Sequence, residues 1–261
     1  MDPGTLIGLV VALVCIFGSM VLEGGNPAVL IAPGPMLLVF GGTFAVCMAS
    51  GLMKDATGII KIFKGALLSK KHDPNETIRQ VVSFAERARR EGLLALEEAA
   101  KAVDDPFLKK GLELAVDGTD PEELHDILEN EIHSMKSRHK VGIKFMENMG
   151  GFAPTLGIIG TVLGLVHVLE NLSDPSKLGP LISGAFIATL WGVMSANIFW
   201  LPMSNKLKRV SEIETHHREL LLEGILSIQA GANPRVIEQK LLTYLAPKDR
   251  EALEAEKSQA A

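Results

Sequence analysis

The residues best placed to do chemistry are oxygen donors inside an apolar stretch. Residues 151–170 read GFAPTLGIIGTVLGLVHVLE, which contains Pro154, Thr155 and Thr161 and no acid before Glu170. A proline removes one backbone donor and frees a carbonyl about one turn earlier. In lipid that carbonyl needs another partner, and the hydroxyls of Thr155 and Thr161 are expected nearby. The stretch therefore predicts a polar stripe on a membrane helix.

A second small, polar face lies in residues 178–205, where it includes Thr189 and is expected to end at Pro202. In the first stretch, Gly157 and the glycines three and seven residues later permit close approach of another helix. Two interpretations remain open. The faces either pack a helical bundle, or they line a cation path in which Thr161 and Thr189 transiently contact a hard cation such as sodium, with no tightly bound metal.

An ion path that does work usually needs an ionisable group within the membrane. The four most apolar segments contain no Asp, Glu, Lys or Arg, and His167, near one end of its segment, is the only candidate base. The chain is therefore not expected to carry ions alone by a carboxylate route. We expect the carboxylate to come from a helix of a partner protein.

The elements that must position these residues are predicted to be membrane helices. Of the 261 residues 22% are charged, and the mean hydropathy is +0.24. Four segments reach the length of roughly 20 residues that crosses a bilayer, at about 5–22, 30–53, 148–169 and 180–203. The first has no basic n-region and no convincing cleavage site, so it is expected to be a retained span and not a signal peptide.

Charge divides the chain into two transmembrane hairpins and two cytoplasmic parts. Only Lys177 of the 26 Lys and Arg residues lies in an outer loop, so both termini are expected in the cytoplasm. The predicted domains are hairpin 1 (1–53), a helical cytoplasmic domain (54–147), hairpin 2 (148–205), and cytoplasmic helices with a fraying tail (206–261). No strand pattern is present, so the fold class is all-α, a polytopic membrane protein with four transmembrane helices.

Proline and glycine predict the helix boundaries of the cytoplasmic parts. Asp-Pro pairs at 73–74, 105–106 and 120–121 are each expected to mark the start of a helix, and at 120–121 Asp120 is expected to cap the helix with a proline at its first position. Gly92 is expected to end the first of these helices, and a short helix follows over 93–103. The helix from Pro121 has no breaker before Gly142 and is expected to run into the third span. The fourth span is likewise expected to continue as a charged helix, before a final helix over 235–245.

Seven blocks of sequence carry a resemblance to a known family. They read MDPGTLIGLV at 1–10, LLVFGGTFAV at 37–46, ARREGLLALEE at 88–98, LAVDGTDPEEL at 114–124, APTLGIIGTVLGLV at 153–166, ATLWGVMSANIFWLPMSNKL at 188–207 and IQAGANPRVIEQKL at 228–241. In order and spacing they resemble the MotA/PomA family, the A-subunits of flagellar stators, over almost the whole chain.

The resemblance implies a protein of the bacterial cytoplasmic (inner) membrane. Five A-subunits are expected to surround two copies of a MotB/PomB-type B-subunit, which supplies the membrane aspartate that binds H⁺ or Na⁺. Ion passage is expected to turn the A ring, a homopentamer, and the cytoplasmic domain to push on the rotor protein FliG. The missing carboxylate agrees with this division of labour.

Residue roles follow from the matching motifs. Pro154 and Pro202 resemble two prolines tied to conformational coupling, and Thr161 and Thr189 resemble the threonines of sodium-type members. The charged residues that resemble the rotor-facing cluster are Arg89, Arg90, Glu97 and Glu98. The chain departs from the sodium-type pattern in having Ala32 in place of an aspartate and Ala188 in place of one of two adjacent threonines. The matches at Thr161 and Thr189 favour sodium over protons despite these two departures.

Other functions are weighed against the stator. An ExbB/TolQ-type energy-transducing subunit would typically have three spans with an outer N-terminus, and a self-contained channel would need its own intramembrane acid or base. The charged cluster at 89–98 could also be an ordinary solvated helix face, where ion pairs contribute roughly 0–1 kcal/mol. The sequence offers no nucleophile–base pair, metal cluster, phosphate loop or basic nucleic-acid patch. We therefore expect no enzyme activity, no cofactor beyond the transported ion, and no nucleic-acid partner.

Overall fold

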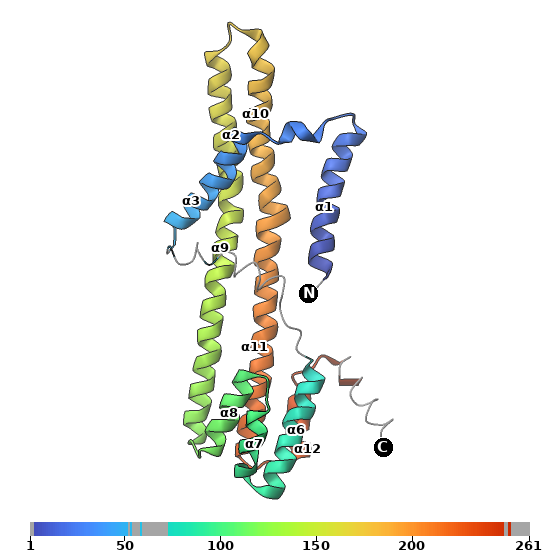
Figure 1. The fold of residues 1–261 in the computed structure, drawn as a ribbon, viewed down its shortest axis with the longest axis vertical. Helices are drawn as coiled ribbons and strands as arrows, with labels where there is room; N and C mark the ends of the chain where they lie inside the picture. Colours follow the sequence, from blue (N-terminus) through green and yellow to red (C-terminus); the bar gives the residue numbers. More distant parts are fainter. Residues whose placement is uncertain (1–2, 52, 54–57, 59–72, 248–249, 252–261) are drawn as a thin grey trace. The chain divides into compact units, whose positions relative to one another are not determined.

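The computed structural model describes residues 3–51, 53, 58, 73–247 and 250–251 (Figure 1). Every regular element in this part of the chain is a helix, which confirms the all-α prediction. Contacts divide the chain into two compact units, one of Met1–Ser69 with Arg138–Val210 and one of Lys70–Ser137 with Ser211–Ala261. The first 19 residues of the predicted cytoplasmic domain (54–72), apart from residue 58, lie outside the described residues. So does most of the tail that was expected to fray.

The first unit is built from apolar helices. Its elements are α1 (Pro3–Leu22), η1 (Pro27–Leu30), α2 (Pro33–Met36), η2 (Leu37–Gly41), α3 (Gly42–Ala49), residues 138–170 of α9 (Pro121–Glu170), α10 (Pro175–Met194), η4 (Ser195–Trp200) and residues 201–210 of α11 (Leu201–Gln229). Trp191 of α10 holds the η1 turn by donating a hydrogen bond from Nε1 to the carbonyl of Leu30, at 2.7 Å.

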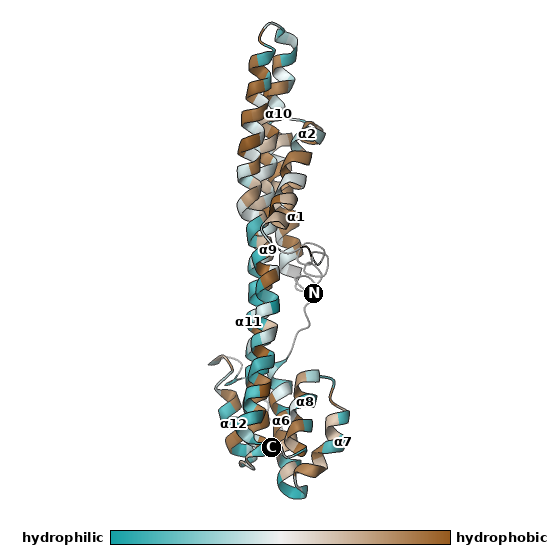
Figure 2. Cartoon of the chain, turned by 90° about the vertical axis from the view of Figure 1, so that its left-hand side faces the viewer, coloured by the Kyte–Doolittle hydropathy of each residue, from teal (hydrophilic) through white to brown (hydrophobic). Residues whose placement is uncertain are grey.

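Three described helices are long and apolar enough to cross a membrane. They are Gly4–Leu22, Pro121–Glu170 and the continuous run Pro175–Gln229. Figure 2 shows hydrophobic residues, in brown, along α1, α10 and the neighbouring part of α9, and more hydrophilic ones, in teal, along much of α11. The span expected over 30–53 corresponds to a shorter apolar helix, Pro33–Ala49.

Both prolines that resemble the family's coupling prolines lie inside helices that continue past them. Pro154 lies within α9, which begins at Pro121 and reaches Glu170 without a break, as the sequence predicted. The helix of the fourth span also passes Pro202 and continues to Gln229, which confirms the prediction that this span continues as a charged helix. The turn before Pro202, η4, is wound as a π-helix. Such local rewinding lets a helix tolerate a missing donor.

The second unit packs shorter helices. They are α6 (Pro74–Glu91), η3 (Leu93–Ala95), α7 (Leu96–Lys101), α8 (Pro106–Val116) and α12 (Pro234–Leu242), together with residues 121–137 of α9 and 211–229 of α11. The predicted starts are confirmed: Asp73, Asp105 and Asp120 each accept a hydrogen bond from a first-turn amide. Gly92 ends α6 with φ of 86°, a conformation that glycine adopts without the strain of a side chain.

A hydrophobic core holds this second unit together. It draws on each of its α-helices, with fully buried members that include Ile78 of α6, Leu96 of α7, Leu112 of α8, Leu128 of α9 and Ile225 of α11. Burying a side chain of this size is worth roughly 1.5–3 kcal/mol. The turn between α6 and α7 is therefore carried on a packed scaffold.

Candidate functional site

Helices α9 and α10 approach each other so closely that their backbones touch. A Cβ atom placed on Gly157 would lie 2.9 Å from the carbonyl oxygen of Ala188 and 3.1 Å from the Cα of Thr189. A Cβ on Gly192 would lie 2.6 Å from the carbonyl oxygen of Ala153. Small residues at this contact permit the approach, which agrees with the packing interpretation of the glycine spacing.

The same approach brings the two threonine hydroxyls together. Thr161 Oγ1 and Thr189 Oγ1 are hydrogen-bonded to each other. Thr161 Oγ1 also lies 3.2 Å from the carbonyl oxygen of Gly157 and 3.1 Å from that of Ala185, and Thr189 Oγ1 lies 3.3 Å from the carbonyl of Gly157. Two hydroxyl and two carbonyl oxygens thus converge between two spans. Neutral oxygens of this kind can coordinate a hard cation.

The site is uncharged. Each hydrogen bond described for the two hydroxyls ends on another hydroxyl or on a backbone carbonyl. His167, the one candidate base, is exposed six residues further along α9. The carbonyl of Ala185 was not foreseen. No local signal in the sequence marks it, because the hydroxyl that reaches it belongs to Thr161 on the other helix.

Thr155 lies outside this convergence. It is exposed, and its hydroxyl donates to the carbonyl of Phe152 at 2.7 Å. The expectation that Thr155 or Thr161 serves the carbonyl freed by Pro154 is therefore wrong for the hydrogen bonds that the structure describes. A threonine hydroxyl in a helix commonly donates to a carbonyl three or four residues earlier in the same helix, as Thr155 does here. The structure brings together Thr161, Thr189 and Gly157, and it separates Thr155 from them.

The four charged residues of the predicted rotor-facing cluster are exposed on the second unit. Arg89 and Arg90 lie in the last turn of α6, and Glu97 and Glu98 lie in the first turn of α7. Glu97 pairs with Lys101 at 3.1 Å, one turn further along α7. The helix ends therefore present basic and acidic side chains on either side of the η3 turn.

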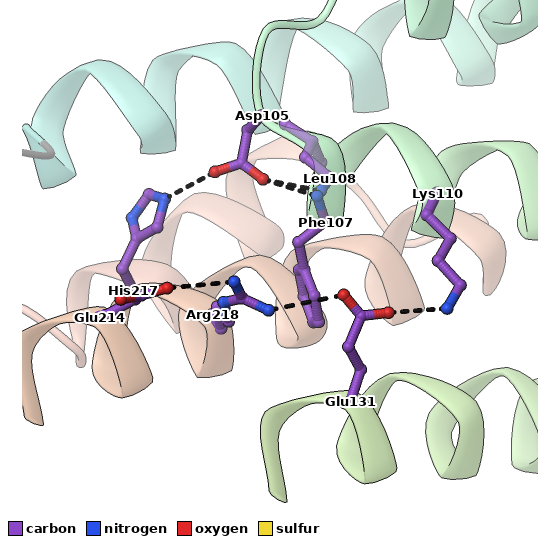
Figure 3. A network of polar contacts seen from close by, with 8 residues as sticks. All are labelled: Asp105, Phe107, Leu108, Lys110, Glu131, Glu214, His217 and Arg218. Carbon is purple, nitrogen blue, oxygen red and sulfur yellow. Dashed lines mark hydrogen bonds and ion pairs between the residues drawn. The ribbon is translucent and has the colours of Figure 1, made fainter. Parts of the chain in front are cut away.

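A partly buried polar pair fixes the start of α8 in the same unit (Figure 3). Nε2 of His217, on α11, lies 3.3 Å from Oδ2 of Asp105, the residue that caps α8. Burial by itself would raise the pKa of Asp105. The hydrogen bond with His217, the amides of Leu108 and Phe107 and the charge of His217 outweigh that effect and lower the pKa to about 2.

Arg218 extends this network to α9. Its guanidinium lies 3.1 Å from a Glu214 oxygen and 3.5 Å from a Glu131 oxygen, and it stacks over the ring of Phe107 at 5.3 Å. Lys110 of α8 closes the network with a 2.7 Å contact to Glu131 (Figure 3). The network links α8, α9 and α11 around the core that carries α6 and α7.

The geometry defines a class of protein. It is a helical membrane protein in which two spans meet at a neutral cluster of oxygens, and whose charged helices pack into a separate unit with its own core. Two family profiles match it: the MotA/TolQ/ExbB proton channel family over residues 99–220 and the Motility protein A N-terminal family over residues 6–92.

Individual relatives match the chain over nearly its full length. Motility protein A of Bacillus subtilis is 41% identical over 96% of this chain and 93% of its own length. Chemotaxis protein PomA of Vibrio alginolyticus is 36% identical over 94% and 96%. A chain of the flagellar MotAB stator complex of Bacillus subtilis superposes with a TM-score of 0.88 at 40% identity, over 95% of this chain and 98% of that one. The chain belongs to the Motility protein A (MotA/PomA) family, which is a family of channel subunits and not of enzymes.

Proposed function

We propose that this chain is the A-subunit of a flagellar stator. With a single-span B-subunit of the MotB/PomB type it would form an ion-conducting complex of the bacterial inner membrane. That complex converts ion motive force into torque on the rotor protein FliG. We propose a homopentameric A ring with both termini in the cytoplasm. The likeness to a chain of a MotAB stator complex supports this assignment.

The observation that carries the proposal is the cluster of oxygens at Thr161 and Thr189. It offers hydroxyl and carbonyl ligands but no charge, and so it is half of an ion site. A carboxylate on a B-subunit helix would supply the missing charge and the group that binds and releases the ion. We propose that the ion is sodium, because two threonine hydroxyls and two carbonyls are hard ligands that need no proton exchange of their own.

The Motility protein A N-terminal match over residues 6–92 favours a stator over an ExbB/TolQ-type subunit. That region contains α1 and the apolar helix Pro33–Ala49, which precede the second unit. A three-span subunit would have no equivalent for one of these two apolar helices.

Swimming speed as a function of sodium tests the proposal. A host without its own stators would carry this chain and its B-subunit, with sodium varied at fixed pH and ionic strength. Thr161→Val removes one hydroxyl while keeping nearly the same shape, and Thr161→Ser restores it. Thr155→Val is the matched control, because Thr155 is on the same helix but its hydroxyl bonds only to Phe152 in the described contacts.

We expect speed to rise and saturate with sodium. Thr161→Val should raise the half-saturating concentration roughly tenfold or more, the equivalent of about 1.4 kcal/mol. Thr161→Ser should largely restore it, and Thr155→Val should leave it unchanged. A speed that ignores sodium but collapses with a protonophore would show a proton motor and reduce the threonines to packing residues. Normal sodium dependence in both Thr161→Val and Thr189→Val would refute the site.

A further inference from the structure

Leu94, between the charged helix ends of the second unit, is unusually exposed. The residue is 75% exposed, against 47% for Ile213 and 48% for Val236, the other large hydrophobic residues described as exposed in that unit. One exposed leucine is ordinary on a protein surface. What distinguishes Leu94 is its position between two charged helix ends.

The backbone around Leu94 is held firmly. The preceding Gly92 has φ of 86° and its carbonyl accepts a hydrogen bond from the amide of Ala95, at 3.2 Å. Leu93 packs against the hydrophobic core and Leu96 is fully buried within it. Of the three leucines in this turn, two anchor it and Leu94 points away. A side chain displayed on a fixed turn loses little freedom on binding a partner.

The charged residues on either side of Leu94 stabilise the helix ends on which they lie. Arg89 and Arg90 lie at the C-terminal end of α6, and Glu97 and Glu98 lie at the N-terminal end of α7. Each pair has the sign that the helix dipole favours at that end. Leu94 carries no charge that a helix end would favour, and it is not among the residues of the hydrophobic core. Charged residues therefore flank Leu94 on both sides along the chain, and an apolar centre with a polar rim is the usual anatomy of a protein interface.

We propose that Leu94 is the apolar anchor of the surface that docks on FliG. This inference rests on the proposed function and adds a specific contact to it. The partner surface would offer an apolar pocket for Leu94, with acidic groups on the side of Arg89 and basic groups on the side of Glu98. The charges would then set orientation and encounter rate, and Leu94 would set how long the contact lasts.

Binding of purified FliG to the purified complex of this chain with its B-subunit tests the anchor. The variants are Leu94→Ala, which shortens the side chain, and Leu94→Asn, which keeps its approximate size but makes it polar. Val236→Ala on α12 is the matched control, an exposed apolar residue of the same unit. Glu98→Lys is compared with them at low and high salt, because screening weakens contacts between exposed charges.

We expect both Leu94 variants to weaken binding at least tenfold at either salt concentration, with ring size and melting temperature unchanged. Val236→Ala should bind as the wild type does, and the loss in Glu98→Lys should shrink as salt rises. Wild-type binding that persists in both Leu94 variants overturns the anchor and leaves the stator role standing. No binding of FliG by the wild-type complex overturns both. Rings that fall apart in Leu94→Asn also overturn the anchor, because Leu94 then faces a second copy of this chain.

Discussion

Gly192→Ala should separate the two spans that carry the oxygen cluster. The added Cβ would lie 2.6 Å from the carbonyl oxygen of Ala153 and 3.0 Å from the Cα of Gly157. Both are backbone atoms, so no flexible side chain can move aside. Ordinary van der Waals contact begins at 3.4 Å, so α9 and α10 would have to part by about 0.8 Å at this point.

That displacement is larger than the hydrogen bonds of the oxygen cluster can absorb. Thr189 precedes Gly192 by less than one turn of α10, and Thr161 Oγ1 reaches across to the Ala185 carbonyl at 3.1 Å. Lengthening this contact by about 0.8 Å takes it beyond hydrogen-bonding range. Overpacking of this kind costs about 1–3 kcal/mol, roughly a five- to 150-fold change in an equilibrium that needs the close approach.

The assay is swimming speed against sodium concentration in a host without its own stators, with ring assembly checked by size-exclusion chromatography. Gly184→Ala is the control, because a Cβ on Gly184, also on α10, would meet nothing within 4 Å. We expect Gly192→Ala to raise the half-saturating sodium concentration by at least fivefold, or to abolish swimming, and Gly184→Ala to do neither. A Gly192→Ala stator with wild-type speed and sodium dependence would refute the link between helix approach and ion site.

Two further predictions concern the second unit. At pH 7, Asp105→Asn should lower the local stability of α8 by about 2 kcal/mol, since the pKa of Asp105 falls from 3.8 to about 2 on folding and each unit is worth roughly 1.36 kcal/mol. Because the folded pKa is the lower one, the stabilisation through His217 is present above about pH 4 and is lost as pH falls towards 2; equal amide hydrogen exchange of α8 in variant and wild type at pH 7 would contradict this. Reversing Arg89 and Glu98 together, as Arg89→Glu with Glu98→Lys, should reduce torque under load without changing ion conduction, measured by tethered-cell rotation and by sodium uptake. Unchanged torque would argue against their rotor role.

Local signals in the sequence determined most of the helix boundaries. Asp73, Asp105 and Asp120 each precede a proline, and each caps the helix that follows, because an Asx side chain can reach first-turn amides whatever the rest of the fold does. Gly92 ended α6 for a similarly local reason, its positive φ. The apolar spans and the family resemblance could likewise be recognised from the sequence, since hydropathy and motif order do not depend on tertiary contacts.

Tertiary structure decided the rest, because those features depend on what lies across the helix. Sequence could place Thr155 and Thr161 on one helix, but only the packing of α9 on α10 sends Thr161 to Thr189 and Ala185 and leaves Thr155 bonded to Phe152. Sequence also predicted that the fourth span continues past Pro202, but only the structure shows the π-helical turn that comes just before this proline. A helix fixes which side chains share a face, but its neighbour fixes the partner that each of them meets.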